Sequence, residues 1–390
     1  MPAVLGGVPT FHDGLPLVRP TIEDPAAVTA DLGRILESGL LTNGATVRRL
    51  EEAVGERLGT EVVAVSSCTA GLMLVLQAVG ATGRVVMPSF TFSASAHAVV
   101  WAGGTVDFAD VEPERATLDP NGLAELLDGA SAMTATHIYG TPCDVEALGK
   151  LADDAGIPLV YDAAHALGSA RDRVPIGRFG IAEVFSLSPT KVVVAGEGGL
   201  ISTTDADLAK TLRMGRDYGN PGDYDTRFCG LNARMSELHA TVALASFAKL
   251  DEHVAVRGAL VDRFEGAIES VPGLRVVRPV DGDTSTFKDL TVVVDEDAFG
   301  MSAPQLQQAL KADGVDTRRY YHPPIHRQQA YEGRWPTPRP LPVTDDLAAS
   351  VLSPPLWSHM EEGTVVRVAD TIATLHGRAD EVVAVLGSAE

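Results

Sequence analysis

Three short segments of the chain carry side chains whose types and spacing could support catalysis. The first, residues 66–71 (Ser-Ser-Cys-Thr-Ala-Gly), lies between an apolar β-branched run and an amphipathic helical pattern. Free N–H groups and the helix dipole at such a junction favour a phosphate group. A helix N-cap at Ser67 or Thr69 explains the same residues equally well. The segment alone therefore predicts either a phosphate site or an ordinary helix start.

The second and third segments supply a carboxylate and an amine. Asp162 ends the apolar run in Tyr-Asp-Ala-Ala-His (161–165). Such strand-end carboxylates commonly face the ligand crevice of an α/β sheet, although a helix N-cap is the alternative. Lys191 lies between a Ser-Pro-Thr turn (188–190) and a Gly-Glu-Gly-Gly return (196–199), so its amine can project into a pocket. Taken alone, a lysine is more often a solvated surface charge.

Together, a phosphate cradle, a strand-end aspartate and a loop lysine are the parts that a pyridoxal 5'-phosphate (PLP) enzyme needs. They would serve as the phosphate anchor, the partner of the pyridinium nitrogen and the Schiff-base amine. The combination therefore predicts a PLP site, which none of the three segments does alone.

These residues require a scaffold that brings distant segments together, and the surrounding pattern predicts an α/β fold. Short β-branched runs bounded by Gly, Pro or Ser alternate with helical patterns, which is typical of β-α-β winding. The candidate strands are Val62 to Val65, Arg84 to Met87, Thr105 to Phe108, Thr134 to Tyr139, Pro158 to Asp162, Glu183 to Leu187 and Leu200 to Thr203.

Apolar periodicity and end signals predict the helices. Apolar residues recur at helical spacing over residues 69–79. Another helix is expected between Asp144, as its N-cap, and Gly156, as the residue that ends it. A longer pattern continues from Met235 to about Leu250, and we expect this helix to link two domains.

The texture of the sequence changes near residue 250, where we place the domain boundary. Beyond it we predict a strand over residues 290–294, a helix over 304–312 and a Pro-rich stretch over 322–342. We therefore expect a large PLP-binding domain with an N-terminal arm over residues 1–250 and a small C-terminal α/β domain over residues 251–390.

Composition and charge exclude several classes of protein. The chain has 31 Lys and Arg against 52 Asp and Glu, a net charge of −21, whereas binding of nucleic acid needs a basic face. No apolar run approaches the ~20 residues of a membrane span, and the start of the chain lacks a signal-peptide pattern. We expect a cytoplasmic protein with reduced thiols, because Cys68, Cys143 and Cys229 lie far apart.

Three other chemistries find little support in the sequence. His322 and His326 are four residues apart, but two prolines between them preclude the helix that would present both rings to a metal. We expect these histidines in a loop at the substrate mouth, and no metal site. No Gly-x-Ser-x-Gly elbow supplies a hydrolase nucleophile, and residues 196–199 are not a dinucleotide-binding fingerprint.

The order and spacing of seven motifs resemble the DegT/DnrJ/EryC1/StrS family of sugar aminotransferases. The match continues through residues 320–326 and covers nearly the whole chain. The motifs are SGLLTNG (38–44), PSFTF (88–92), HIYG (137–140), DAAH (162–165), SPTK (188–191), GEGG (196–199) and LNARMSE (231–237).

The resemblance implies the PLP-dependent transferase fold type I, with a mostly parallel seven-stranded sheet in the large domain. It assigns catalytic roles to Lys191 as the Schiff-base lysine, to Asp162 at the pyridine nitrogen and to His165 near the phenolic oxygen. It also implies a homodimer, in which an asparagine reaches the cofactor phosphate of the neighbouring subunit. The further cofactor contacts are the backbone at Cys68 and Thr69 and the Ser186 hydroxyl at the phosphate, Phe92 on the ring, and Asn232 from the partner.

The family acts on nucleotide-linked keto-sugars, and most relatives take the amino group from L-glutamate. Arginine binds a diphosphate through bidentate hydrogen bonds, and tyrosine offers a face to a base, although a solvated patch explains any single arginine as well. The residues expected to contact the substrate are Arg227, Arg319, Tyr320, Tyr321 and His326.

The resemblance favours amination at C4 of a dTDP-4-keto-6-deoxyhexose, in deoxyaminosugar biosynthesis. The alternatives are a C3 aminotransferase, a PLP-dependent sugar dehydratase and a non-catalytic regulator that binds nucleotide sugars. Relatives with a histidine in place of Lys191 are dehydratases, and a regulator would be expected to lose Lys191 or Asp162. The presence of both residues counts against these last two alternatives.

Overall fold

The structure is a computed structural model that describes residues 1–333, 335 and 339–387. Four residues of the Pro-rich stretch (334 and 336–338) and the last three residues of the expected C-terminal domain lie outside the described residues.

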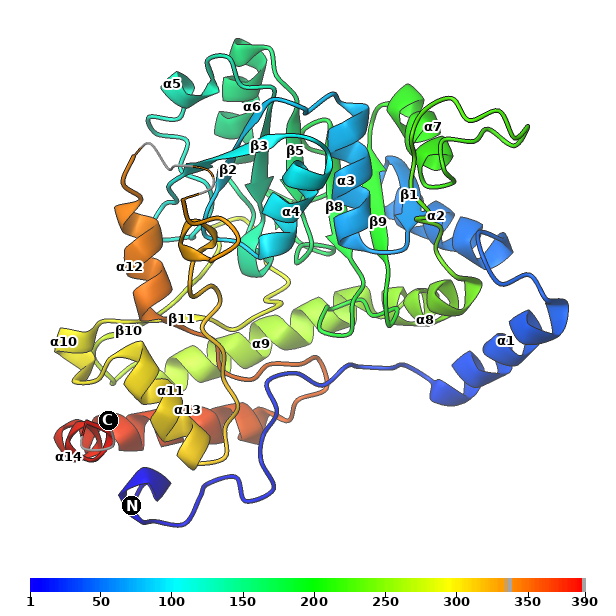
Figure 1. Ribbon diagram of the computed structural model, residues 1–390. Helices are drawn as coiled ribbons and strands as arrows, with labels where there is room; N and C mark the ends of the chain where they lie inside the picture. Colours follow the sequence, from blue (N-terminus) through cyan, green and yellow to red (C-terminus); the bar gives the residue numbers. More distant parts are fainter. Residues whose placement is uncertain (334, 336–338, 388–390) are drawn as a thin grey trace.

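A seven-stranded sheet forms the centre of the larger part of the molecule, in the order β1-β9-β8-β5-β4-β2-β3 (Figure 1). β9 is antiparallel to both of its neighbours, and the other neighbouring pairs are parallel. The carboxyl ends of the parallel strands therefore meet at one edge of the sheet. The strands are β1 (Glu61–Val65), β2 (Arg84–Pro88), β3 (Thr105–Ala109), β4 (Ala132–Thr136), β5 (Leu159–Asp162), β8 (Ala182–Ser186) and β9 (Gly199–Thr203).

Helices cover both faces of this sheet, because each strand sends alternate apolar side chains to opposite sides. Val63 and Val65 pack toward α3 (Cys68–Ala78), α4 (Ser93–Trp101) and α7 (Ala206–Gly215). On the other face, Val62 and Ala64 pack with α2 (Ala45–Leu58) and α8 (Glu237–Phe247). Further along that face lie α5 (Ala124–Leu127) and α6 (Val145–Ala155). A short β-hairpin of β6 (Ala170–Arg171) and β7 (Val174–Pro175) lies outside the sheet.

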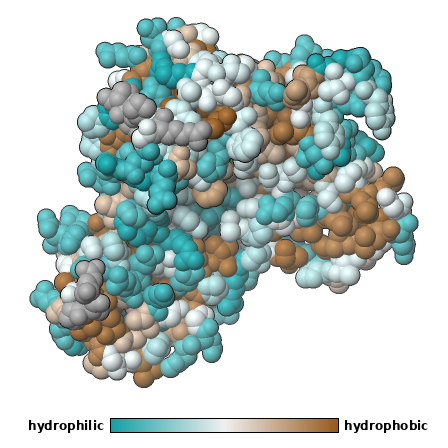
Figure 2. Space-filling model, in the orientation of Figure 1, coloured by the Kyte–Doolittle hydropathy of each residue, from teal (hydrophilic) through white to brown (hydrophobic). Residues whose placement is uncertain are grey.

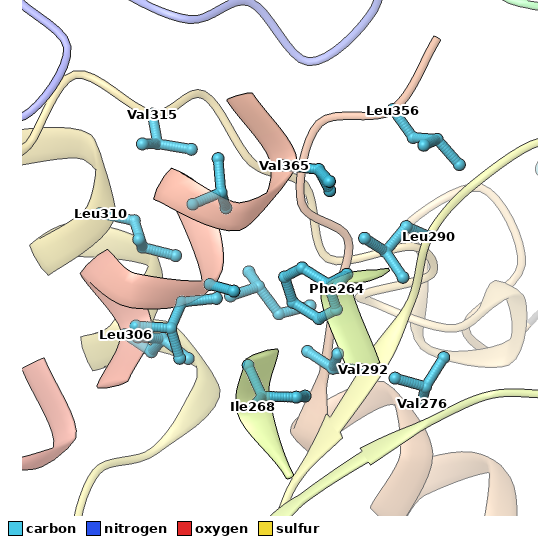
Figure 3. Packing of buried hydrophobic residues seen from close by; sticks show 14 of the residues in the cluster. Phe264, Ile268, Val276, Leu290, Val292, Leu306, Leu310, Val315, Leu356 and Val365 are labelled. Carbon is cyan, nitrogen blue, oxygen red and sulfur yellow. The ribbon is translucent and has the colours of Figure 1, made fainter. Parts of the chain in front are cut away.

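The C-terminal part of the chain forms a second core around Phe264 (Figure 3). Its three-stranded antiparallel sheet has the order β10-β11-β12. α9 and α13 cross this part side by side (Figure 1). The elements of this part of the chain are α9 (Leu250–Ile268), β10 (Leu274–Val276), β11 (Val292–Val294), α10 (Glu296–Phe299), α11 (Ala303–Ala312), η3 (Ile325–Arg327), α12 (Pro342–Ser350), β12 (Val351–Leu352), α13 (Glu362–His376) and α14 (Ala379–Leu386). Of these, η3 and α12 bury their apolar residues outside this core, in the clusters of Phe108 and Phe90.

The N-terminal residues also belong to this second core. The 3₁₀ helix η1 (Ala3–Leu5) contacts α11 and α14, and Leu15 is buried in the cluster of Phe264. The chain then crosses to α1 (Pro25–Ser38), which packs against α8 (Figure 1). The N-terminal arm therefore bridges the two parts of the molecule.

The sequence correctly predicts the α/β fold and places every strand of the large sheet. It also places α6 correctly: the Asp144 side chain accepts a hydrogen bond from the Ala147 N–H, and Gly156 ends the helix in the left-handed conformation. Two element boundaries were wrong. β4 ends at Thr136 rather than at residue 139, and the predicted linking helix is in fact α8 followed by α9, with a break at residues 248–249.

Candidate active site

A cavity of about 370 Å³ lies where β4, β5 and β8 end at the carboxyl edge of the sheet. Volumes of this order hold small ligands and cofactors. It collects side chains and backbone from segments that are far apart in the sequence. Among the residues that the sequence assigned to a site, those that line the cavity are Cys68, Thr69, Phe92, Asp162, His165, Ser186, Lys191, Tyr320 and Tyr321.

Asp162 lines this cavity as the last residue of β5. Its side chain is only 4% exposed. One carboxylate oxygen accepts a hydrogen bond from the Ser95 hydroxyl at 2.5 Å, and the other accepts one from the Ala164 N–H at 3.1 Å. These bonds fix the carboxylate in one orientation toward the cavity.

The N-terminus of α3 forms one wall and offers donors for an anion. The Ser67 hydroxyl caps the helix by accepting a hydrogen bond from the Ala70 N–H. Within the part of the chain that the structure describes, the N–H groups of Cys68 and Thr69 have no hydrogen-bond partner. A Cβ atom on Gly199 would lie 2.7 Å from the Cys68 nitrogen, so only glycine leaves this backbone accessible. The sequence was consistent with either a helix cap or a phosphate site. In the structure the Ser67 hydroxyl caps the helix, and the N–H groups of Cys68 and Thr69 are left for a phosphate.

α3 can bring these donors to the cavity because Gly71 lets the helix pack closely on the sheet. A Cβ atom at Gly71 would lie 2.7 Å from a methyl group of Val184 on β8 and 3.2 Å from Val65 and Ile201. The position of the helix N-terminus therefore depends on the absence of one methyl group.

Lys191 projects into the cavity from the loop between β8 and β9. Burial lowers the pKa of its amine from the usual value of 10.5 to about 8, and the positive charge of Lys288 adds to this effect. An amine with a pKa near 8 is partly neutral at physiological pH. It can therefore act as a nucleophile and can accept a proton.

His165 lies beside Lys191 and is neutral. Burial lowers its pKa well below 6.5, and the charges of Lys191 and Lys288 lower it further. Its Nδ1 accepts a hydrogen bond from the Tyr139 N–H at 3.1 Å. A neutral ring that accepts at Nδ1 carries its proton on Nε2, so His165 can donate one hydrogen bond.

Sequence reasoning missed two groups at this site. A chain of hydroxyls connects Thr136 through Thr91 to Ser95, which donates to Asp162. No motif carries Ser95, although it lies only three residues after the PSFTF segment. Lys288, which lines the cavity with its side chain 4% exposed, comes from the C-terminal part of the chain, where no pattern singled it out.

Four of the expected residues do not line this cavity. Asn232 and Arg227 are exposed, and Arg227 pairs with Asp223 and Asp225 in its own loop. Arg319 does not line the cavity either: one terminal nitrogen of its guanidinium donates to the carbonyl groups of Ala348 and Ala349 at the end of α12, and its Nε has no partner among the described residues. His326 lies outside the cavity and is bound to Ser89 and Asp345.

A second hollow adjoins the cavity and shares Phe92, Tyr320 and Tyr321 with it. Arg318, Arg319 and His322 line this hollow, so its basic groups come from the Arg-Arg-Tyr-Tyr-His run (318–322). The three shared aromatic residues therefore form a common wall between the two hollows.

The residues in the cavity fit PLP. Unpartnered N–H groups at a helix N-terminus suit its phosphate, a fixed buried carboxylate suits its ring nitrogen, and a partly neutral lysine suits its aldehyde. No group of three or more side chains suited to a metal ion occurs in the described part of the chain. Likewise, none of the helices described here is long and apolar enough to cross a membrane.

Comparison with known proteins places these features in context. The model of the DegT/DnrJ/EryC1/StrS aminotransferase family matches residues 24–373. The dTDP-4-amino-4,6-dideoxy-D-glucose transaminase of Escherichia coli is 27% identical, over 91% of this chain and 96% of that protein. The dTDP-3-amino-3,4,6-trideoxy-alpha-D-glucose transaminase of Streptomyces venezuelae is 32% identical, over 91% of this chain and 94% of that protein.

A solved structure resembles the whole chain. The crystal structure of DesI in the presence of its TDP-sugar product superposes with a TM-score of 0.93. The two chains are 38% identical, and the match covers 98% of each. The similarity therefore extends over both cores as well as the cavity.

Proposed function

Because the chain belongs to the DegT/DnrJ/EryC1/StrS aminotransferase family, whose members depend on PLP, we propose that it transfers an amino group from L-glutamate to a nucleotide-linked keto-sugar. The observation that carries this proposal is the meeting of Lys191, Asp162 and His165 around one cavity, at the N-terminus of α3.

Each of these residues has a separate role in the proposed reaction. When bound, PLP supplies an electron sink for the carbon that loses a proton. Asp162 keeps the ring nitrogen protonated, because a nearby buried anion favours the charged form. The Nζ atom of Lys191 takes the proton from the substrate carbon and later returns a proton. His165 donates its Nε2–H to the phenolic oxygen.

The N–H groups of Cys68 and Thr69 and the Ser186 hydroxyl, which line the cavity, would hold the phosphate of PLP. Asn232 adds a donor from the partner subunit, so the proposed active unit is a homodimer.

An exposed apolar area on the surface supports the proposed homodimer. Figure 2 shows this area over α1 and its neighbours, where Leu40 is 71% exposed and Leu36 is 61% exposed. Apolar areas of this kind mark protein–protein contacts.

We place the nucleotide part of the substrate in the second hollow. Arg318, Arg319 and His322 line it with basic groups, of which Arg318 also pairs with Asp316 through Nη1. Tyr320 and Tyr321 offer ring faces to the base. The sugar would then reach the first cavity past Phe92. Arg227 is exposed and, like Asn232, can serve only a site outside its own cavity, so we propose that it contacts the substrate across the dimer.

Three further points belong to the proposal. We take the sugar to be a dTDP-4-keto-6-deoxyhexose aminated at C4; the relatives include a 4-amino and a 3-amino sugar transaminase, so C3 is the alternative. The domain division stays near residue 250. The enzyme would act in the cytoplasm, in keeping with the unpaired state of Cys68, Cys143 and Cys229.

The test is direct. Purified enzyme is incubated with PLP, L-glutamate and a panel of dTDP-keto-sugars, and NMR identifies the aminated carbon. Borohydride treatment of the holoenzyme should attach PLP covalently to a peptide that contains Lys191. Lys191→Ala should lose both the adduct and turnover, whereas Lys150→Ala, on the exposed face of α6, should keep both. An adduct on another lysine, or no aminated sugar from the wild-type enzyme, would contradict the proposal.

A further inference from the structure

A second ammonium group, that of Lys288, lies in the cavity together with Lys191. Among the described residues that line the cavity, these two are the only lysines, and no arginine joins them. In the proposed reaction, Lys191 binds the cofactor and transfers protons. Lys288 is therefore the side chain that offers a fixed positive charge to a ligand.

The segment that carries Lys288 is held firmly across the two parts of the molecule. The Lys288 N–H donates to the Tyr139 carbonyl at 2.9 Å, and the Thr286 hydroxyl donates to the His165 carbonyl at 2.6 Å. The buried guanidinium of Arg257 donates to the carbonyl groups of Phe287 and Lys288. A Cβ atom on Gly140 would lie 2.0 Å from the Thr286 hydroxyl, so this close approach requires glycine. The local structure thus fixes where Lys288 enters the cavity.

The ion pair with Asp289 leaves some of the N–H donors of Lys288 unused. Its Nζ donates to Asp289 Oδ1 at 2.7 Å and lies 5.1 Å from the centroid of the Tyr320 ring. An ammonium group has three N–H donors, and Asp289 takes one of them. Asp289 is itself 5% exposed, and its Oδ2 has no hydrogen-bond partner among the described residues. A buried ion pair with donors and an acceptor to spare can exchange partners when a charged ligand arrives.

An aminotransferase has to accept two different substrates in one cavity. The amino donor carries carboxylates, whereas the sugar ring of the acceptor is uncharged. We propose that Lys288 binds a carboxylate of the amino donor, and that it pairs with Asp289 alone when the sugar occupies the cavity. This inference rests on the proposed function in one respect, which is that the donor is an amino acid such as L-glutamate.

Glutarate tests the inference by binding alone, because it has the two carboxylates of glutamate but no amino group to react. Its affinity for the PLP-loaded enzyme is measured by calorimetry. Lys288→Met combined with Asp289→Asn avoids leaving one buried charge unpaired, and it should weaken glutarate binding ~10- to 100-fold, the loss of one charge-assisted hydrogen bond. Asp289→Asn alone should tighten binding, since it removes the competing carboxylate. Lys150→Met, which removes an exposed lysine, should change nothing.

The two half-reactions separate this inference from the proposed function. In the double variant, the spectral change on adding L-glutamate should need a higher glutamate concentration, while the reverse change on adding the amino-sugar product should keep its concentration dependence. If the wild-type enzyme accepts no sugar but Lys288 still governs glutarate and glutamate binding, the inference stands and the sugar substrate is wrong. If sugars react and glutarate binds equally to wild type and double variant, the inference is overturned.

Discussion

Asp162 illustrates how one side chain at the edge of a sheet is prepared for a single task. Its two oxygens are held by Ser95 and by the Ala164 N–H, so the carboxylate does not need to reorient when a positive charge comes close. Preorganised groups of this kind make the largest contributions to catalysis, because no reorganisation accompanies the reaction.

Asp162→Asn should therefore bind PLP and lose most of its activity. A neutral amide keeps the shape of the carboxylate but cannot hold a proton on the ring nitrogen. Removal of one charge-assisted bond at a reacting centre lowers the rate by roughly 10²-fold or more. Single-turnover absorbance measurements with L-glutamate would show this loss. Turnover close to wild type would mean that another residue faces the ring nitrogen.

The environment of Lys191 leads to a second prediction, which concerns pH. With a pKa of about 8 in the cofactor-free enzyme, roughly one amine in ten is neutral at pH 7. Only the neutral amine reacts with acetic anhydride, so acetylation of Lys191 should rise with pH, reach half of its maximum near pH 8 and level off above about pH 9. Competitive labelling followed by peptide mass spectrometry measures this profile.

Lys150 provides an internal control in the same sample. Its hydrogen bond to Asp154 raises its pKa above 10.5, so its labelling should still increase at pH 10. If the profiles of the two lysines coincide, Lys191 does not have the buried environment described above.

Among the elements, α3 contributes most directly to the site, and its position depends on Gly71. Gly71→Ala places a methyl group 2.7 Å from Val184, so the helix has to move away from the sheet. Overpacking of this kind costs about 1–3 kcal/mol of stability, and displacement of the helix N-terminus should also weaken PLP binding. Urea unfolding and an absorbance titration with PLP measure the two effects.

Gly149→Ala is the matched control, since Gly149 lies in α6 and a methyl group added there would have no neighbouring atom within 4 Å. The same substitution in a helix with free space should raise stability by about 0.5–1 kcal/mol and leave PLP binding unchanged. Equal effects of both substitutions on PLP affinity would exclude a specific role of α3 packing.

How far the elements could be predicted depended on whether local or distant contacts decide them. The strands of the large sheet were found because their buried apolar residues are continuous and end at Gly, Pro or polar residues. The end of β4 was misplaced because Ile138 and Tyr139 prolong the apolar run. In the structure the His137 ring accepts a bond from the Cys143 N–H, and Tyr139 adopts a left-handed conformation in the 3₁₀ helix η2 (Ile138–Gly140).

For the site, too, residues placed by local contacts could be predicted, whereas residues placed by distant contacts could not. Asp162 and Lys191, which the structure brings to one cavity, could be singled out because they stand at junctions between local elements, whose pattern is visible in the sequence. Lys288 was missed because hydrogen bonds from Arg257 and to Tyr139, both remote in the sequence, bring it to the cavity. Arg319 was assigned to the substrate because it belongs to the most concentrated cluster of basic and aromatic residues, and the sequence could not show that one of its nitrogens donates to the carbonyl groups at the end of α12.

At the scale of the whole molecule, the proposed sharing of sites between two subunits leads to a complementation experiment. Asn232 is exposed and does not line its own cavity, so Asn232→Ala should impair the partner's site. In a hybrid of Lys191→Ala and Asn232→Ala subunits, one site carries both lesions and the other carries neither. Activity after subunit exchange should therefore exceed the sum of the two parents.

This result requires that Asn232→Ala alone is impaired and that exchange is verified independently, for instance with two affinity tags. No increase in activity, despite verified exchange, would show that each site is completed within one chain.

The order of strands in the large sheet has a consequence for how the protein is made. β1 lies at the edge, and β9 is the one strand of the sheet that pairs with it, from Glu61 opposite Thr203 to Val65 opposite Gly199. A ribosome adds roughly 5 to 20 residues per second, so β9 is synthesised on the order of ten seconds after β1. During this time the apolar residues of β1 have no strand to pair with. The nascent chain therefore exposes an aggregation-prone edge until β9 is made, and chaperones that bind apolar segments can cover β1 during this interval.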